Sequence, residues 1–188
     1  MAAVKLSSGL LQAARQQPSP NCDARPDGMQ PELIVVHGIS LPPGDFGGPW
    51  IDRLFTNCLD PDAHPYFAEI CELRVSSHFL IRRDGELVQY VPLDQRAWHA
   101  GESRFAGRDC CNDFSIGIEL EGLDDAPYDA RQYEQLAALI AMLRGTVPSL
   151  RRAPVVGHSD IAPGRKTDPG RAFDWQLLAR LLKGSEFA

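Results

Sequence analysis

Apolar residues from position 33 onward occur in short runs separated by turn residues, a pattern that predicts strands. The run LIVV at 33–36 is continuous and rich in β-branched residues, as expected for a buried strand. The segment SHFLIRRDGELVQYV predicts a hairpin, because two β-rich arms flank a turn that contains Asp84 and Gly85. Apolar residues alternate with polar or small ones in FSIGIEL, at 114–120, which predicts a strand with one apolar face. The segment APVVGH predicts a further short strand.

Two longer segments have the spacing of amphipathic helices. In residues 129–145, Asp129 and Gln132 resemble a capping box, and Gly145 is suited to end the helix. The segment DWQLLARLLKG predicts a second helix, which Asp174 would cap. PWIDRLF predicts a short helix, whereas residues 57–73 lack clear periodicity and predict an irregular insertion.

The order of these elements predicts an α/β fold with a single mixed β-sheet flanked by helices. A chain of 188 residues is typical of one domain with a sizeable core. Residues 1–31 end in the turn-rich stretch PSPNCDARPDGMQP, so we expect a loosely ordered N-terminal lead-in followed by one domain at 32–188.

Charge and hydropathy indicate which classes of binding partner are not expected for this chain. The net charge is −6 without a Lys/Arg-rich block, so we expect no nucleic-acid partner. No apolar run approaches the length of a membrane span, and polar residues interrupt the apolar positions at the N-terminus, so we expect neither a membrane partner nor a signal peptide. The five cysteines are odd in number and contain no CxxC, which favours reduced thiols in the cytoplasm.

Candidate chemistry is concentrated in the stretch GHSDIAPGRKTDPG, at 157–170. It brings His158, Lys166 and Asp168 into one loop that prolines and glycines keep from being helical. His37 ends the LIVVH run much as His158 ends PVVGH, and the ends of strands are suitable positions for catalytic groups. Two histidines and one aspartate would give Zn²⁺ three protein ligands and leave a fourth position open for water, as in catalytic zinc sites.

A zinc hydrolase also needs a proton acceptor and a group that stabilises the oxyanion. Glu119 and Glu121 lie on the same polar face of the predicted strand, and spacing alone does not choose between them as the base. Lys166 lies two residues before Asp168, so its ammonium would point toward the metal, where it can stabilise negative charge on a carbonyl oxygen.

Other residues offer alternatives. His64, His78 and His99 compete as ligands, although His64 is expected in a loop and His78 in a hairpin arm, and His99 in AWHAG can line a cleft beside Trp98. Arginine side chains suit the capture of substrate carboxylates, but most arginines are solvated surface residues; the candidates are Arg74, Arg108 and Arg165. The pair Cys110–Cys111 lacks an evident neighbouring base, so we do not expect a cysteine nucleophile.

Four separated blocks resemble the zinc amidases that cleave N-acetylmuramoyl-L-alanine bonds: VVHGISLPPGDFGGPWIDRLF, SSHFLIRRDGELVQYVP, AWHAGESRFAGRDCCNDFSIGIELEG and GHSDIAPGRKTDPGRAFDW. The resemblance extends over about 33–182. It implies zinc ligands at His37, His158 and Asp168, a base at Glu119 and an oxyanion-stabilising Lys166. It also implies the fold of peptidoglycan recognition proteins and phage amidases, although the phage-type enzymes have Cys where this chain has Asp168.

The resemblance further implies a substrate and a setting. The substrate would be a soluble 1,6-anhydromuropeptide, cut between the lactyl carbonyl and L-alanine in cytoplasmic peptidoglycan recycling, with an indirect effect on β-lactamase induction. Separately from the resemblance, we expect the chain to be a monomer. Arg74 and Arg108 would anchor the carboxylates of the stem peptide, and His99 and Trp98 would shape the sugar end. Many relatives carry Asn at the position of Gly38, so a contact made by that Asn would be absent here.

Two other functions are compatible with the same fold. An envelope amidase would trim intact peptidoglycan, and a secretion signal would favour it. Recognition proteins that bind without catalysis on this fold often lack a metal ligand, whereas this chain retains all three candidates. Activity on soluble and cross-linked substrates separates the first from a recycling enzyme, and metal analysis tests the second.

Overall fold

A six-stranded mixed sheet forms the centre of the molecule. The computed structural model describes residues 6–7 and 9–185. The strand order is β12-β5-β11-β6-β7-β3. The bounds are Val155–Gly157 for β12, Leu33–Ile39 for β5, Ser115–Glu121 for β11, Phe79–Ile81 for β6, Leu87–Gln89 for β7 and Arg15–Gln16 for β3. The strands β12, β5, β11 and β6 are parallel, and β7 runs antiparallel to β6. The predicted hairpin and the predicted mixed sheet are confirmed.

The central strands are buried on both faces because helices or loops cover each side. The side chains of residues 33–36 in β5 are at most 1% exposed. Parallel strands in such a position are typically continuous apolar runs, and β5 begins with one. Strand β11 keeps the alternation that its sequence predicts, with Ile116, Ile118 and Leu120 in the core on one face and polar or small residues on the other.

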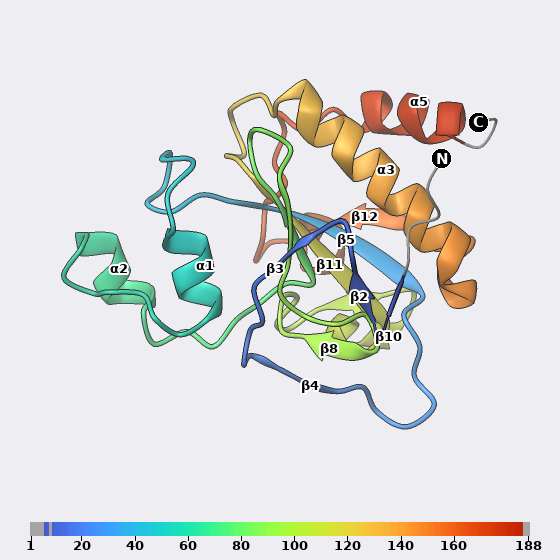
Figure 1. Ribbon diagram of the computed structural model, residues 1–188, viewed down its shortest axis with the longest axis horizontal. Coiled ribbons are helices and arrows are strands. Elements are labelled where there is room, and N and C mark those ends of the chain that lie inside the picture. Colours follow the sequence, from blue (N-terminus) through green and yellow to red (C-terminus); the bar gives the residue numbers. More distant parts are fainter. Residues whose placement is uncertain (1–5, 8, 186–188) are drawn as a thin grey trace.

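Two helices lie together over one face of the sheet, α3 (Ala130–Thr146) and α5 (Trp175–Ser185) (Figure 1). Asp129 and Gln132 form the predicted capping box at the start of α3. The prediction that Gly145 ends this helix is wrong, because α3 continues to Thr146 and stops shortly before Pro148. Asp174 accepts a hydrogen bond from the backbone N–H of Leu177, so it caps α5 as expected.

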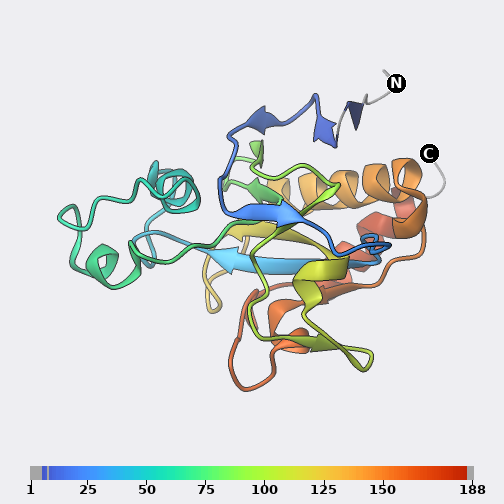
Figure 2. The same cartoon turned by 90° about the horizontal axis from the view of Figure 1, so that it is seen from below.

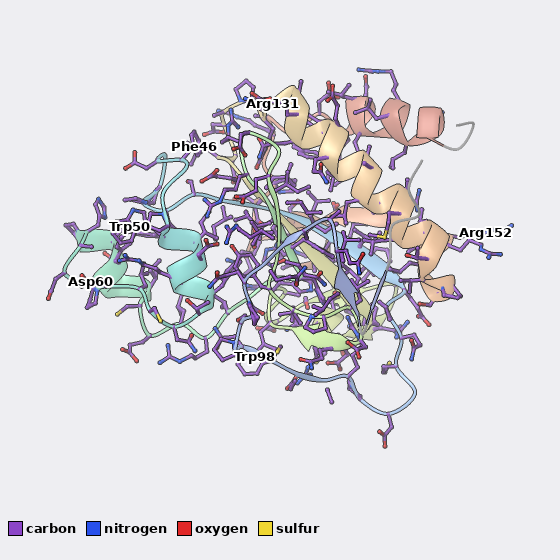
Figure 3. The ribbon with its side chains drawn as sticks, viewed as in Figure 1. Phe46, Trp50, Asp60, Trp98, Arg131 and Arg152 are labelled. Atoms are coloured by element: carbon purple, nitrogen blue, oxygen red, sulfur yellow. The ribbon has the colours of Figure 1, made fainter. Side chains whose placement is uncertain are left out.

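Two short helices project from the other side of the molecule, α1 (Trp50–Phe55) and α2 (Pro65–Ile70) (Figure 2). Helix α2 lies inside the segment 57–73, which was predicted to be irregular. Six residues are too few to show helical periodicity, but His64 caps α2 by accepting from the N–H of Tyr66. Trp50, labelled in Figure 3, packs its ring 5.0 Å from that of Phe67 and joins the two helices.

Short elements complete the fold beside the sheet. Their bounds are Leu6–Ser7 for β1, Leu10–Leu11 for β2, Cys22–Ala24 for β4, Gln95–Ala97 for β8, Arg104–Phe105 for β9, Arg108–Asp109 for β10, Cys111–Phe114 and Pro148–Leu150 for two 3-10 turns, and His158–Ile161 for α4. The helical turn α4 contradicts the expectation that the whole stretch 157–170 is non-helical, since Pro163 follows rather than interrupts it.

The described part of the N-terminal lead-in is bound to the domain, contrary to the expectation of loose order. Strand β3 extends the central sheet and β4 pairs with β8. The guanidinium of Arg25 donates to the carbonyls of Asn112, Asp113 and Ser115. Turn-rich composition predicted a loop here, but these long-range hydrogen bonds have no local sequence signal. The part of that prediction at residues 1–5 and 8 lies outside the described residues.

Tyr128 occupies the space that two glycines leave on the helix-covered face. A Cβ on Gly38 would lie 2.3 Å from its hydroxyl oxygen, and a Cβ on Gly122 would lie 2.2 Å from the Cε1 atom of its ring, both closer than real Cβ contacts. The same hydroxyl donates to the carbonyl oxygen of Pro169 at 2.9 Å. Gly38 is therefore a packing requirement of this chain, and the phenol of Tyr128 connects β5 to the loop that follows α4.

We predict that Gly38→Ala lowers the free energy of unfolding by about 1–3 kcal/mol, because the added methyl overlaps the Tyr128 hydroxyl. In a Tyr128→Phe background the same change should cost clearly less, since the overlapping atom is gone. Urea unfolding of the double-mutant cycle measures this coupling.

Gly145→Ala is the matched control, because a Cβ there meets nothing within 4 Å and the helix gains about 0.5–1 kcal/mol. Additive effects of Gly38→Ala and Tyr128→Phe would show that the two positions are not in contact.

Candidate metal centre and active site

Three neighbouring parallel strands position the candidate residues. His37 is the fifth residue of β5 and lies opposite Glu119 of β11 in the sheet register. His158 follows β12 directly and begins α4. The expectation that both histidines lie at strand ends is met by His158, whereas His37 lies two residues before the end of β5. Both imidazoles reach the face of the sheet opposite α3, since His37 alternates with Ile34 and Val36 of the helix-covered core.

One atom from each of three side chains converges on a common point. The Nδ1 atoms of His37 and His158 are 3.0 Å apart. The Oδ2 atom of Asp168 lies 3.2 Å from the Nδ1 of His37 and 3.1 Å from that of His158. Within the described part of the chain, these three residues form the group whose geometry suits a metal ion. The sequence prediction of this trio is therefore matched by its placement.

Hydrogen bonds cannot satisfy the three converging atoms of this trio at the same time. The Nε2 of His158 lies 3.2 Å from the carbonyl oxygen of Ala100, which only accepts, so Nε2 carries the proton. The Nδ1 of a neutral His158 then presents a lone pair toward the carboxylate oxygen of Asp168. One shared proton can satisfy only one of the three contacts, whereas a metal ion accepts a lone pair from each atom. The donor set therefore fits a metal cation.

Burial and charge act on the protonation of these groups. Burial lowers the pKa of His37 to about 4, which keeps its imidazole neutral as a metal ligand requires. Burial opposes ionisation of Asp168, but its contacts with His158 and His37 hold the pKa of that carboxyl well below its usual range. At neutral pH His37 thus offers a neutral nitrogen and Asp168 a carboxylate.

The trio opens into a cavity of about 550 Å³. Its lining contains the polar groups of the cluster together with largely apolar side chains, which include Leu54, Phe55, Tyr66 and Ile70. Trp98, labelled in Figure 3, lines the same cavity. A cavity with convergent polar groups and an apolar wall is suited to a small ligand with a polar reacting group.

Glu119 lines this cavity as a buried carboxyl group. It is 8% exposed, and its Oε2 atom has no hydrogen-bond partner among the described residues. Burial raises the pKa of Glu119 well above its usual value, the charge of Asp168 adds to the rise, and Lys166 opposes it. An unpartnered buried carboxyl with a raised pKa is the expected state of a group that takes up and releases a proton.

Glu121 is committed elsewhere, which separates the two glutamates that the sequence left equivalent. Its carboxylate accepts from the backbone N–H groups of Gly47 and Arg83, and it pairs with the guanidinium of Arg82 at 3.4 Å. These contacts tie β11 to the loop before α1. Glu121 does not line the main cavity.

Lys166 reaches the cavity from the loop after α4. The residue is exposed, and no hydrogen bond or ion pair joins its ammonium to another residue in the described part of the chain. An ammonium without a partner among the described residues is available to a ligand at the cavity wall, and the predicted oxyanion-stabilising role of Lys166 stays a prediction.

The histidines considered as alternative ligands have other positions. His64 caps α2, and His78 is fully buried with its Nδ1 accepting from the N–H of Gly117. His99 lines the cavity, but its Nδ1 faces the Nε2 of His37 at 2.9 Å, on the side away from the trio. His99 therefore contacts His37 on the side away from the trio and is not placed as a metal ligand itself.

The arginines differ in their access to the cavity. Arg74 is exposed between two lining residues, Leu73 and Val75, and pairs with Glu72 at 3.7 Å. Arg108 on β10 pairs with Glu32 at 2.6 Å, away from the lining residues, so the structure does not bring it to the site. The guanidinium of Arg165 donates to the carbonyls of Ala100 and Glu102 and holds that loop.

Sequence reasoning missed Asn112, whose Oδ1 atom accepts from the backbone N–H groups of both His99 and Ala100. An asparagine in a polar loop gives no signal of such a role, because the contact depends on the folded path of the chain. All five cysteines are free thiols, as predicted, and Cys111 is buried. No helix in the described residues has the length and apolar character of a membrane span.

Known proteins resemble this chain over most of its length. The family described as N-acetylmuramoyl-L-alanine amidase matches residues 27–171. The 1,6-anhydro-N-acetylmuramyl-L-alanine amidase AmpD of Escherichia coli K12 is 63% identical over 177 residues, covering 94% of this chain and 96% of that protein. The crystal structure of a selenomethionine derivative of AmpD is 60% identical with a TM-score of 0.91, over 95% of this chain and 99% of that one.

More distant structures share the fold. The amidase AmiD of E. coli, in complex with anhydro-N-acetylmuramic acid-L-Ala-D-γ-Glu-L-Lys, is 30% identical with a TM-score of 0.56, over 84% of this chain and 60% of that one. The endolysin LysCS of Clostridium intestinale, 18% identical with a TM-score of 0.63 over 92% of this chain and 96% of that one, shows the phage-amidase-like fold alone. On the family match and the identity over nearly its whole length, this chain belongs to the N-acetylmuramoyl-L-alanine amidase family of hydrolases.

Proposed function

We propose that this chain is a zinc-dependent amidase that hydrolyses the bond between the lactyl group of 1,6-anhydro-N-acetylmuramic acid and the L-alanine of a stem peptide. The observation that carries the proposal is the convergence of His37, His158 and Asp168 at 3.0, 3.1 and 3.2 Å beside the unpartnered carboxyl of Glu119. The names of the AmpD and AmiD relatives support the bond and the anhydro sugar.

Zinc fits the donor set better than a hard cation does. Magnesium and calcium prefer six or more oxygen ligands, whereas two imidazole nitrogens with one carboxylate are common for zinc. Tetrahedral zinc with bonds of about 2.0–2.1 Å separates its ligand atoms by roughly 3.3 Å. The observed separations of 3.0, 3.1 and 3.2 Å are close to that value. His37, His158 and Asp168 would hold the ion, and the cavity leaves room for a fourth ligand.

When bound, zinc would lower the pKa of a water molecule and polarise the scissile carbonyl. Glu119 then accepts the proton of the attacking water, because its Oε2 has no competing donor among the described residues. The water oxygen adds to the carbonyl carbon, and the Lys166 ammonium stabilises the charge on the carbonyl oxygen. The carbon–nitrogen bond breaks as Glu119 returns its proton to the amine of L-alanine.

The setting and the substrate contacts are further parts of the proposal. The chain would act on soluble anhydromuropeptides in cytoplasmic peptidoglycan recycling, and removal of these fragments would limit β-lactamase induction. Arg74 is not among the residues that line the cavity, but its exposed guanidinium lies next in sequence to the lining residues Leu73 and Val75, and binding of a stem-peptide carboxylate there stays a prediction. Trp98 lines the cavity and offers a ring for apolar contact with the substrate.

Removal of zinc is predicted to abolish hydrolysis, and added zinc to restore it. Mass spectrometry of an anhydromuropeptide digest should show the free stem peptide with L-alanine at its N-terminus, and chelator-treated protein should leave the substrate intact. Faster hydrolysis of cross-linked sacculi than of the soluble fragment would support an envelope amidase instead. Zinc-free protein at full activity would refute the metal mechanism.

Loss of either polar group of the reaction is predicted to lower kcat while zinc remains bound. Glu119→Gln removes the proton acceptor, for a loss of about 10²- to 10⁴-fold, and Lys166→Ala removes the oxyanion donor, for about 10²- to 10³-fold. Steady-state kinetics together with zinc content per chain measures both effects.

Matched controls are Glu134→Gln on α3 and Lys183→Ala on α5, which change the same residue types at exposed positions away from the cavity. Wild-type turnover in the Glu119 or Lys166 variant would remove that residue from the mechanism.

A further inference from the structure

A chain of hydrogen bonds leads from a backbone carbonyl to the buried side of His37. Ser115 lies 2.5 Å from the carbonyl oxygen of Cys111 and 3.1 Å from the Nε2 of His99, measured at its Oγ atom. The Nδ1 of His99 lies 2.9 Å from the Nε2 of His37. His37 and His99 also line the cavity, but the proposed reaction does not use these hydrogen bonds.

The direction of every bond in this chain follows from its fixed end. A carbonyl oxygen only accepts, so the single hydroxyl proton of Ser115 points to Cys111. The Ser115 oxygen must then accept from the Nε2–H of His99. A neutral imidazole carries one proton, so the Nδ1 of His99 has a lone pair and accepts from the Nε2–H of His37. His37 is thereby left with its lone pair on Nδ1, the atom that faces Asp168.

The backbone carbonyl of Ala100, next to His99, fixes the tautomer of His158 in the same way. The carbonyl oxygen of Ala100 accepts from the Nε2 of His158, which leaves the lone pair of His158 on Nδ1 as well. The Oδ1 atom of Asn112 accepts from the N–H groups of His99 and Ala100 at 3.1 and 2.8 Å. One dipeptide, held by one asparagine, therefore contacts both imidazoles from behind.

Packing fixes the plane of the His99 ring. Any Cβ on Gly117 would lie 2.5 Å from the Cγ atom of His99, so the ring lies flat on the backbone of β11. The rings of His37 and His99 meet edge to face with their centroids 5.0 Å apart. The ring of His99 cannot turn without breaking both of its hydrogen bonds.

We propose that His99 is a positioning residue, which fixes the tautomer and orientation of His37 through the relay to Ser115 and thereby raises the affinity of the site for its metal ion. This inference rests on the proposed zinc site and assigns to His99 a role other than substrate contact. Groups that orient metal-bound histidines typically contribute about 10- to 100-fold in metal affinity.

The test is the zinc dissociation constant of the full chain, measured by competition with a chromophoric chelator. His99→Phe keeps a ring on Gly117 but removes both nitrogens, and we expect zinc binding to weaken about 10- to 100-fold. Ser115→Ala removes only the acceptor at the end of the relay and should weaken binding by less, in the same direction. Because Ser115→Ala shortens a side chain without adding bulk, it tests the relay even if His99→Phe folds poorly.

Two controls match these changes. His64→Ala removes the histidine that caps α2, and Ser149→Ala removes a hydroxyl that has no partner among the described residues. Both should bind zinc within twofold of the unsubstituted chain.

Nitrogen-15 NMR gives a readout that general loss of stability does not move. In the unsubstituted chain the proton of His37 should be on Nε2. In the His99→Phe variant the imidazole of His37 should populate both tautomers. Unchanged zinc affinity in both relay variants, with His37 still on one tautomer, would overturn the inference. Absence of zinc binding by the unsubstituted chain would instead overturn the proposed metal site.

Discussion

Parallel pairing of β5 with β11 and with β12 is the constraint on which the site depends. The register places Glu119 beside His37, and the end of β12 delivers His158 next to the same strand. These residues are far apart in the sequence, so no local preference brings them together. A slip of one residue in β5 would turn His37 into the apolar core and Val36 toward the cavity. Dense packing on both faces of β5 prevents that slip, because its first four side chains are at most 1% exposed.

The same rigidity allows the site to keep groups that are unfavourable for folding. Burial of Glu119 without a hydrogen-bond partner costs stability, and lone pairs that face each other in the trio add electrostatic repulsion in the absence of a cation. The surrounding sheet and the loop held by Tyr128 supply the compensating interactions. Hydrogen bonds offset the cost of burial for the carboxylate of Glu121, and a carboxylate held in this way would be a poor proton acceptor. Function and stability therefore make opposite demands on two residues of one strand.

Sequence patterns predicted the elements whose signals are local and strong. The capping box of α3, the hairpin at Gly85 and the alternation in β11 follow from spacing and turn chemistry. The trio was suggested by residue type, and the family resemblance selected Glu119 over Glu121, a distinction that the sequence pattern alone left open. Contacts between distant segments had no such signal. The anchoring of the lead-in by Arg25 and the hold of Asn112 on His99 depend on tertiary structure, and the pairing of Arg108 with Glu32 was equally hidden.

The central claim is that two imidazoles and one carboxylate bind a single ion through defined atoms. Anomalous diffraction at the zinc absorption edge, from crystals of the zinc-loaded protein, tests it most directly. The account predicts one peak per chain at the centre of the trio, within bonding distance of both Nδ1 atoms and of an Asp168 oxygen. A peak at another position, or coordination through the Nε2 atom of either histidine, would contradict it.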